Sequence, residues 1–311
     1  MSNKIVSIIV VAAGTKSHLK SCLDSIKEQS YTSVETIVID NSLSNDFYNE
    51  FSDSYPGARL YPGQESLSYC AALNKGIGIA NGDFILCLND DACLDKDYIT
   101  EALKGFALEE RIGMVSGKIL RADKEMIDST GMFLTLWRTA GERGYGAKDR
   151  GQFEKSGYIF GVNGAVAFYR RKMLEEIKIG SEYFDPLFRF FYEDLDVAWR
   201  AENLGWRGYY VPGAIAYHVR GLTARQGKGL NKGFARRYLS DDLNFDLIKN
   251  RYLTIIRNES FPGLLLHLPF ILFYNAGIWS YVLFFRPQLM KKVFLLNKHI
   301  LAALKKRLFH E

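Results

Sequence analysis

Apolar runs rich in β-branched residues recur in the first third of the chain. Residues 5–11 (IVSIIVV), 34–40 (VETIVID) and 83–90 (DFILCLND) are the clearest of these runs. Continuous apolar runs of this length are typical of strands that are buried on both faces of a sheet. Segments with helical spacing lie between them, at about 17–29 and near 66–80. Strands that alternate with helices predict an α/β fold with a mostly parallel sheet flanked by helices.

The pattern is less regular further along the chain. Residues 113–170 contain many glycines and one strand-like stretch that begins within them, GVNGAVAFYRR (161–171). In FYEDLDVAWRAENLGWRG (191–208), apolar residues recur at helical spacing, which predicts a helix. YYVPGAIAYHVRG (209–221) is again strand-like, and residues 222–237 are Gly-rich and basic, which is typical of a mobile loop.

The predicted helix begins with three carboxylates in four positions, Glu193, Asp194 and Asp196. Acids in a first turn complement the positive end of the helix dipole, at about 0.3–1 kcal/mol each when exposed. A metal site or a catalytic base would account for the same cluster. The pattern alone leaves these three interpretations open.

An apolar segment, residues 261–285, is the most distinctive part of the C-terminal region. Its 25 residues include no charged side chain apart from His267 when that is protonated, and it is long enough to cross a hydrocarbon core of about 30 Å. Prolines and glycines within it would weaken a straight helix. It could span a membrane, lie on the membrane surface or be a buried core helix. Flanking cations such as Arg257 and Arg286, and its aromatic residues, favour contact with a membrane interface.

Composition narrows the class of protein. Hydrophobic residues make up 48% of the chain and charged residues 24%, which is typical of a globular protein. The four cysteines include no C-x-x-C pair, so neither a zinc site nor a disulfide framework is indicated. The N-terminal segment lacks the hydrophobic core and the cleavage site of a signal peptide, so we expect a cytosolic start.

The net charge of +5 is distributed unevenly along the chain. Residues 219–311 hold 16 Lys and Arg against 5 Asp and Glu, a net charge of +11, whereas residues 1–218 carry −6. A basic C-terminal region on an acidic body predicts an anionic partner surface. The cations flank apolar runs and do not alternate with aromatics as in a nucleic-acid groove. We therefore expect an anionic membrane surface and no nucleic acid.

Polar side chains follow two of the predicted parallel strands, where ligands of such sheets bind. Asp40 and Asn41 end the second strand and would suit a nucleobase edge or a ribose hydroxyl, although they also suit a turn. The triplet NDD (89–91) would hold Mg²⁺ or Mn²⁺ together with substrate phosphates, or would form another turn. His218 ends a later strand and would supply either a nitrogen ligand or a structural contact.

Taken in order, these segments resemble the family 2 glycosyltransferases, which have the GT-A fold with a Rossmann-like sheet. The likeness is to the bacterial branch that contains rhamnosyl- and galactofuranosyltransferases. It covers residues from about 5 to 220, with a weaker echo in KNRYLTIIRN (249–258). The motifs that carry the resemblance are VSIIVV, VIDNSLSND, NKGIGIANGDFILCLNDDACLD, GVNGAVAFYRR, FYEDLDVAWRAENLGW and AIAYHVRG.

The resemblance implies a role for particular residues. Asp91 and His218 would hold Mn²⁺ or Mg²⁺. Asp194 would be the catalytic base, and Glu193 would orient the acceptor. Asp196 is expected to serve only the start of the helix. The donor site would comprise Asp40 at a pyrimidine base, Asp90 near the ribose, and Asn41, Asn74, Gly76, Asn163 and Gly164.

Two positions depart from the family pattern. The first strand usually runs into a polar loop of T-Y-N type, but here it continues into Ala12, Ala13 and Gly14. Donor contacts from that loop would therefore come only from the backbone or be absent. The first position of the family's D-x-D motif is the neutral Asn89, so one metal contact would be lost or mediated by water.

The resemblance implies an inverting, metal-dependent glycosyltransferase. Because the C-terminal region is basic and apolar, we expect it at the cytoplasmic face of the cell membrane, where a lipid-linked acceptor would lie. The donor would be a nucleoside-diphosphate sugar, with dTDP-rhamnose expected first and a UDP-sugar second. The acceptor would be a lipid-linked glycan or polysaccharide in cell-surface polysaccharide synthesis. Inversion requires a base that removes the acceptor's proton, while the metal neutralises the leaving diphosphate.

The expected organisation is a catalytic domain over 1–220 followed by a basic, apolar, helical membrane-associating region over 221–311. Within the catalytic domain, the donor half would be about 1–115 and the acceptor half about 116–220. One alternative is a transferase that acts on polyprenyl phosphate itself. Another is a catalytically silent nucleotide-sugar-binding protein or membrane scaffold. The sequence leaves the oligomeric state open.

Overall fold

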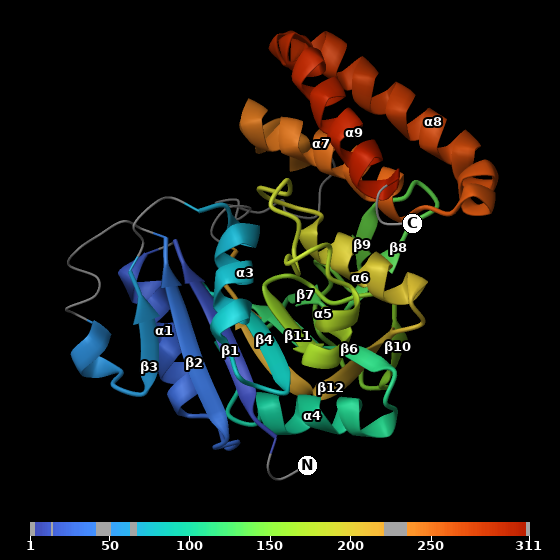
Figure 1. The fold of residues 1–311 in the computed structure, drawn as a ribbon. Coiled ribbons are helices and arrows are strands. Elements are labelled where there is room, and N and C mark those ends of the chain that lie inside the picture. The colour runs from blue at the N-terminus through green and yellow to red at the C-terminus, as the bar shows by residue number, and fades with distance from the viewer. Residues whose placement is uncertain (1–3, 14, 42–50, 63–66, 221–234, 309–311) are drawn as a thin grey trace.

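The computed structural model describes residues 4–13, 15–41, 51–62, 67–220 and 235–308. Figure 1 shows a body built on a sheet, with three C-terminal helices laid across one end of it. These helices are α7 (Asp241–Asn258), α8 (Phe261–Phe285) and α9 (Val293–Leu308). The predicted loop over 222–237 lies outside the described residues as far as position 234, and so does Gly14.

One large mixed sheet forms the body, with its strands in the order β10-β12-β6-β11-β4-β1-β2-β3. The strands from β4 to β3 are parallel to one another, and so are β12 and β6. β11 is antiparallel to both of its neighbours. The bounds are β1 (Val6–Ala12), β2 (Val34–Asp40), β3 (Ala58–Tyr61), β4 (Phe84–Asn89), β6 (Ile112–Arg121), β10 (Gly157–Ile159), β11 (Val166–Arg170) and β12 (Arg207–His218). Two short strands extend the sheet and two form a separate hairpin: β5 (Ala92–Leu94) beside β12, β7 (Ile127–Ser129) beside β6, and β8 (Met132–Leu134) paired with β9 (Ala140–Glu142).

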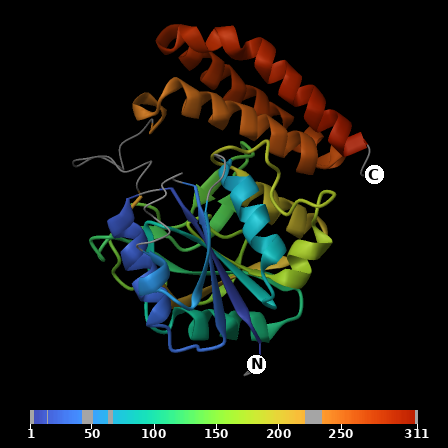
Figure 2. The same ribbon diagram turned by 60° about the vertical axis from the view of Figure 1, so that its left-hand side comes forward.

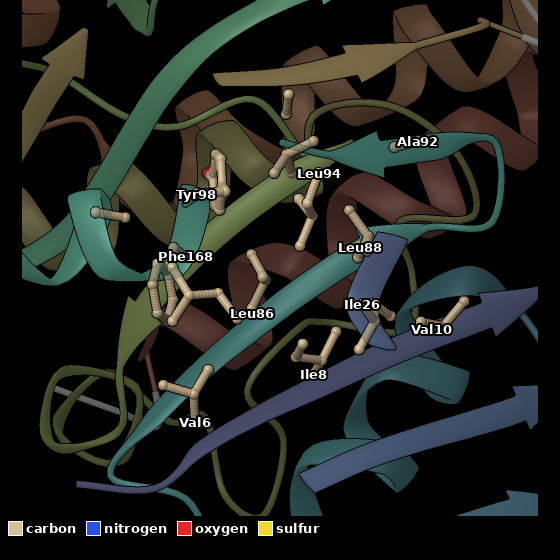
Figure 3. Close-up of a cluster of buried hydrophobic side chains, with 14 of the residues drawn as sticks. Val6, Ile8, Val10, Ile26, Leu86, Leu88, Ala92, Leu94, Tyr98 and Phe168 are labelled. Carbon is tan, nitrogen blue, oxygen red and sulfur yellow. The ribbon is translucent and has the colours of Figure 1, made fainter. Parts of the chain in front are cut away.

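Helices cover both faces of the sheet, which is why its central strands are apolar on both sides. Side chains of α1 (Lys16–Lys27) and α4 (Tyr98–Leu108) pack on one face, in a cluster that also includes Val6, Ile8 and Val10 of β1. Figure 3 shows this cluster, with Tyr98 and Phe168 beside the strand residues. α3 (Tyr69–Ile79), α5 (Arg171–Glu176) and α6 (Glu193–Asn203) pack on the other face. The predicted α/β fold with a mostly parallel sheet is confirmed.

The register of the central strands brings their polar ends to one edge. Ala12 of β1 pairs with Asp40 of β2, and Val11 pairs with Asn89 of β4. The predicted strands at 5–11, 34–40 and 83–90 correspond to β1, β2 and β4. Their carboxyl ends therefore meet, as expected of parallel neighbours.

The segment that looked irregular contains a central strand, β6, which is a correction to the sequence analysis. Gly113 and Gly117 interrupt its apolar run and conceal the pattern. Both glycines are required by close packing: a Cβ at Gly117 would lie 2.0 Å from the carbonyl oxygen of Ala214 in β12. The strand predicted over 161–171 is also shorter, because β11 begins only at Val166.

The C-terminal helices form a layer of their own on the body (Figure 2). α8 is, by length and composition, the one helix in the described part of the chain that could cross a membrane. Most of its large apolar side chains are exposed, and only Ile271 and Val282 are buried, so the interpretation as a buried core helix was wrong. A small apolar core that includes Phe245, Ile248 and Val282 joins α8 to α7.

Candidate active site

The end of β4 lies beside the loop that follows β1. Asp90 is buried, and one of its carboxylate oxygens accepts a hydrogen bond of 2.8 Å from the backbone N–H of Ala13. This contact uses a backbone donor of the Ala12-Ala13-Gly14 segment, where the family pattern has polar side chains. Asn89 is also engaged, since its Oδ1 accepts a hydrogen bond of 2.8 Å from the hydroxyl of Tyr69.

Asp91 and His218 are brought together by the pairing of β5 with β12. The Nε2 of His218 lies 3.2 Å from Asp91 Oδ1, and both side chains are largely buried. On its other side, His218 Nδ1 lies 2.9 Å from Oδ2 of Asp128, which is fully buried and also paired with Arg220. Burial lowers the pKa of His218, but its hydrogen bonds with Asp128 and Asp91 outweigh that effect and raise it.

These two side chains fit a hard divalent cation. Asp91 and His218 supply an oxygen and a nitrogen donor 3.2 Å apart, and together they would hold a cation such as Mn²⁺ or Mg²⁺. Such ions are commonly held by one or two protein groups together with substrate phosphates. The Asp128 carboxylate would then orient His218 from behind, as in many histidine metal ligands. Among the described residues, no group of three or more His, Cys, Asp or Glu side chains is arranged to hold a metal by itself.

Asp40 and Asn41 end β2 at the same edge. Asp40 is buried, with an exposed fraction of 3%. The amide of Asn41 forms two hydrogen bonds with the backbone of Leu67, donating from Nδ2 at 2.8 Å and accepting at Oδ1 at 2.9 Å. Asn41 therefore fastens the segment before α3 to the end of β2, which leaves Asp40 as the stronger candidate for a donor contact.

Two residues of α3 that were assigned to the donor site have structural roles. The Asn74 side chain donates to the carbonyl of Phe184 at 2.6 Å and accepts from the N–H groups of Tyr183 and Phe184. A Cβ at Gly76 would lie 2.4 Å from Cγ2 of Ile9, so this glycine lets α3 approach the sheet. This close packing accounts for a glycine at position 76, and its predicted place in the nucleotide pocket stays a prediction.

The start of α6 places Glu193 and Asp194 beside the loop that precedes β11. The N–H of Gly164 donates to Oδ2 of Asp194 at 3.0 Å, and a Cβ at Gly164 would contact both carboxylates. Glu193 Oε2 is shielded from solvent and has no hydrogen-bond partner among the described residues. Burial raises the pKa of both carboxyls, and the charge of Asp194 raises that of Glu193 further.

A third carboxylate, Glu142 at the end of β9, belongs to the same cluster. It accepts a hydrogen bond of 2.8 Å from Asn163 Nδ2 and a second one from the hydroxyl of Ser129. Burial is the main cause that raises its pKa to about 7, and the charge of Asp194 adds to it. Asn163 and Gly164, adjacent in sequence, thus connect the Glu142 and Asp194 carboxylates. Asn163 therefore contacts the carboxylate cluster, and its predicted contact with the donor stays a prediction.

The backbone before α6 is strained. Phe191 and Tyr192 have φ angles of 68° and 72°, a left-handed conformation that costs a non-glycine residue about 1–3 kcal/mol. Asn250 of α7 stabilises this turn, because its Nδ2 donates to the carbonyls of Phe190 at 2.6 Å and Phe191 at 2.8 Å. The direction in which α6 begins is therefore held from the C-terminal helices.

Asp196 has a structural role, as predicted, but not the predicted one. It is fully buried, its Oδ2 pairs with Nε of Arg200 at 2.9 Å, and its Oδ1 accepts from Asn258 Nδ2 at 2.8 Å. It is therefore the centre of a buried network that joins α6 to α7, and not a solvated acid at a helix dipole. α7 follows the predicted domain boundary at residue 220, yet it packs on α6 and on the loop that leads into it.

Sequence reasoning missed Asp128, Glu142, Tyr69 and Asn250. Asp128 and Glu142 lie in β7 and β9, short strands without a spacing pattern. Their contacts join residues far apart in the chain, such as Asp128 and His218. The only available signal was for Asn250, which lies in the KNRYLTIIRN echo of the family pattern.

Known proteins resemble the chain in sequence and in fold. The model of the family described as "Glycosyl transferase family 2" matches residues 7–178. Amylovoran biosynthesis glycosyltransferase AmsB of Erwinia amylovora is 26% identical over 235 residues, 72% of this chain and 72% of AmsB. Glycosyltransferase GlyA of Streptococcus pneumoniae serotype 4 is 28% identical over 102 residues, 32% of this chain. The matched part is only 14% of GlyA.

A solved structure confirms the predicted GT-A fold. The mannosyltransferase PcManGT of Pyrobaculum calidifontis, solved in complex with GDP-Man and Mn²⁺, superposes with a TM-score of 0.56 at 15% identity. The superposition covers 99% of this chain and 88% of PcManGT. At this level of identity, the likeness concerns the arrangement of the chain and not the sugar.

Proposed function

The chain belongs to glycosyl transferase family 2, and we propose that it is an inverting, metal-dependent transferase. Its donor is a nucleoside-diphosphate sugar, and its acceptor is a lipid-linked glycan in cell-surface polysaccharide synthesis. Resemblance to the rhamnosyltransferase branch supports dTDP-rhamnose as the first donor to test and a UDP-sugar as the second. The name of AmsB, for amylovoran biosynthesis, supports a biosynthetic role.

The observation that carries this proposal is the link between the Asp194 carboxylate and the end of β4. Gly164 donates its N–H to Asp194, and its carbonyl lies 3.4 Å from the Tyr69 hydroxyl, which also bonds to Asn89. One short loop therefore positions a carboxylate next to the strand end that precedes Asp91. Inverting transfer requires this combination of a base and a diphosphate site.

Asp194 is the base in the proposed reaction. It takes the proton of the acceptor hydroxyl while that oxygen attacks the anomeric carbon and the diphosphate leaves from the opposite side. The raised pKa of Asp194, which burial causes, makes the carboxylate a better proton acceptor than an exposed one. Glu193 is adjacent, and its Oε2 has no hydrogen-bond partner in the described part of the chain, so we assign it to a hydroxyl of the acceptor.

Asp91 and His218 would hold Mn²⁺ or Mg²⁺ in the proposed site, with Asp128 fixing the ring of His218. A bound cation would neutralise the negative charge that develops on the leaving diphosphate. The presence of Mn²⁺ in the complex of PcManGT supports this assignment. Asp40 contacts the nucleobase, and Asp90 lies nearer to the ribose.

The C-terminal helices support an acceptor at the cytoplasmic face of a membrane. Large apolar side chains are exposed along α8, among them Leu266 at 70%, Phe273 at 73% and Phe284 at 74%. Lys291 and Lys298 are exposed on the segments that follow. Apolar contact together with cations is the combination that holds a helix at an anionic membrane surface.

A donor screen tests the proposed reaction. Purified protein is incubated with dTDP-rhamnose, UDP-sugars and GDP-mannose, with Mn²⁺ or in chelator, and the release of nucleoside diphosphate is measured with and without a membrane extract as the acceptor. We expect release with one donor, dependent on the metal and stimulated by the extract. A product on polyprenyl phosphate would favour that alternative acceptor, and no turnover with any donor would favour a silent binding protein.

Sedimentation with vesicles tests the membrane assignment separately. The protein is expected to sediment with vesicles that contain phosphatidylglycerol, and high salt is expected to release it, because salt screens the electrostatic part of the attraction. Retention at high salt would indicate a helix that spans the bilayer. A protein that stays in the supernatant with all vesicles would contradict membrane association.

A further inference from the structure

Glu142, the last residue of β9, is a carboxylate to which the proposed reaction assigns no role. Its two oxygens contact different parts of the site. Oε1 accepts a hydrogen bond of 2.8 Å from Nδ2 of Asn163, and Oε2 accepts one from the hydroxyl of Ser129. Asn163 lies in the loop before β11, whereas Ser129 ends β7. The side chain of Glu142 therefore joins these two elements.

The loop that contains Asn163 also holds the proposed base. Asn163 Oδ1 accepts a hydrogen bond of 2.9 Å from the N–H of Ala165, so both ends of its amide are engaged. Between these two residues, Gly164 donates its N–H to Oδ2 of Asp194 at 3.0 Å. Among the described residues, this is the one hydrogen bond that the Asp194 carboxylate accepts from outside α6. The position of this loop therefore fixes how the carboxylate is turned.

The other contact of Glu142 anchors it to the body of the protein. Ser129 accepts a hydrogen bond of 3.1 Å from the N–H of Gly131, and it donates the single proton of its hydroxyl to Glu142. β7, which ends at Ser129, pairs with the central strand β6. The residue before Ser129 is Asp128, the partner of His218. One carboxylate thus connects the strand behind the proposed metal site with the loop beside the proposed base.

These contacts require a carboxylate, which a neutral amide would replace only in part. The Asn163 amide and the Ser129 hydroxyl both donate to Glu142, and only a carboxylate offers an acceptor at each of its two ends. An acid is otherwise unfavourable here: burial, the main cause, raises the pKa of Glu142, and the negative charge of Asp194 raises it further. Hydrogen bonds to both oxygens offset part of that cost. They account for a carboxylate at this position.

We propose that Glu142 is a positioning residue for the base. It fixes Asn163, and with it the N–H of Gly164, so that the Asp194 carboxylate is held toward the acceptor hydroxyl. Glu142 acts through these residues and touches neither substrate. Small displacements of a reacting group are costly, since a shift of about 1 Å can lower a rate about a hundredfold. The inference rests on the proposed function, because it requires Asp194 to act as the base.

Four variants and one control test this role in the sugar-transfer assay. Glu142→Ala removes both acceptor oxygens, Glu142→Gln keeps one of them for Asn163, and Asn163→Ala breaks the same link from its other end. The fourth variant combines Glu142→Ala with Asn163→Ala. The matched control is Glu125→Ala, whose side chain is 63% exposed and pairs with Lys148 at the surface. Each protein is compared with the wild type in kcat, in the KM for the donor and in Tm.

We expect Glu142→Ala to lower kcat about 10–100-fold, the usual effect of losing a group that orients a functional side chain. The KM for the donor should stay within about twofold, because the donor edge is held by other residues. Glu142→Gln should regain part of the lost kcat. Asn163→Ala should resemble Glu142→Ala, and the double variant should fall no further than either, because all three break one link.

An unchanged kcat in a folded Glu142→Ala would overturn the proposal. Losses that multiply in the double variant would also overturn it, because the two residues would then act independently. So would an equal loss of kcat in Glu125→Ala. If Glu142→Ala does not fold, a normal kcat in Asn163→Ala overturns the proposal instead.

Hydrogen exchange of the loop separates this inference from the proposed function, because it needs no donor. The amides of Gly164 and Ala165 are hydrogen-bonded, so they should exchange slowly while the loop is held. Glu142→Ala should speed their exchange about tenfold, measured by mass spectrometry on peptides that cover them, and Glu125→Ala should not. In a protein without sugar transfer, faster exchange would support positioning of the loop by Glu142. Unchanged exchange would overturn the inference, even in a protein that transfers sugar.

Discussion

The two sides of the candidate active site are held in different ways. On the donor side, apolar strands in register bring Asp40 and the NDD triplet to one edge, and the helices beside them pack through apolar contacts. On the acceptor side, the loop over 185–192 and the start of α6 are held by polar side chains of α7. Lys249 donates to the Leu187 carbonyl, Asn250 to those of Phe190 and Phe191, and Arg257 pairs with Asp185.

This difference indicates where a substitution should do most harm. A packed apolar edge tolerates the loss of one surface contact, whereas a buried polar network leaves unpaired groups when one member is removed. Substitutions on the donor side should therefore act mainly by removing a catalytic or metal-binding group or by disturbing apolar packing. Substitutions on the acceptor side should act mainly by breaking buried polar contacts and lowering the free energy of unfolding. Some of these contacts are made by α7, which lies outside the predicted catalytic domain.

The largest effect is expected on the donor side, from Asp91→Ala. Metal-dependent turnover should fall to the background of the assay, because one of the two proposed protein ligands is lost. Binding of nucleoside diphosphate, measured by calorimetry with Mn²⁺, should weaken in parallel. The matched control is Asp97→Ala, an exposed aspartate that forms no capping hydrogen bond at the start of α4. Full activity of Asp91→Ala, or of the wild type in chelator, would contradict the metal site and indicate that the NDD triplet only forms a turn.

The next effect concerns the acceptor-side network. Asp196→Ala removes one partner of a buried ion pair and should lower the free energy of unfolding by about 3–5 kcal/mol, measured in urea. Lys20→Ala breaks another i,i+4 pair, Lys20 with Asp24, on the exposed face of α1 and should cost about 0.5 kcal/mol or less. If both variants lose the same free energy of unfolding, the buried network of the acceptor side is no more important to stability than an exposed ion pair.

A smaller effect is expected where α3 meets the sheet. Gly76→Ala should cost about 1–3 kcal/mol, because the new methyl group overlaps the stiff, buried side chain of Ile9. Gly78→Ala is the matched control in the same helix, where open space surrounds the site, and it should stabilise the protein by up to about 1 kcal/mol. If Gly76→Ala instead keeps its stability and loses donor affinity, Gly76 lines the nucleotide pocket as the family resemblance implied.

The last expected effect is a dependence of stability on pH that comes from Glu142. Its pKa is raised to about 7, so the folded protein holds the proton of the Glu142 carboxyl more tightly than the unfolded chain does. The free energy of unfolding should therefore fall as the pH rises from about 4.5 through about 7. The slope is at most about 1.4 kcal/mol per pH unit. Glu142→Gln should therefore gain in Tm relative to the wild type between pH 5 and pH 8, in chelator. If the Tm values of the two proteins change in parallel with pH, Glu142 does not titrate in this range.

The sequence predicted the central strands of the donor side well because their signals are local. Each of β1, β2 and β4 is a single apolar run, and the polar residues follow directly in the chain. Asp91 and His218 were identified as a pair by resemblance, and their geometry required the pairing of β5 with β12. The strand β6 was not predicted, because two glycines at close contacts interrupt its apolar pattern.

The acceptor side was harder to predict because its contacts join distant parts of the chain. Asn258 bonds to Asp196 and Asn250 to Phe190, and neither pair has a spacing pattern that could be recognised. Asp196 was therefore predicted to serve only the start of the helix, although it is the centre of a buried network. Glu142 reaches the site from a short hairpin strand, where a lone acid carries no signal.

The most direct test of the account is the turnover of Asp194→Asn beside its donor affinity. This change keeps the volume of the side chain but removes its ability to take a proton, so kcat should fall by about 10²–10⁴. Donor affinity with Mn²⁺ and the Tm should stay near those of the wild type, because the donor edge is held by other residues. Glu193→Gln should affect mainly the KM for the acceptor. A folded Asp194→Asn that turns over at the wild-type rate would contradict the assignment of Asp194 as the base.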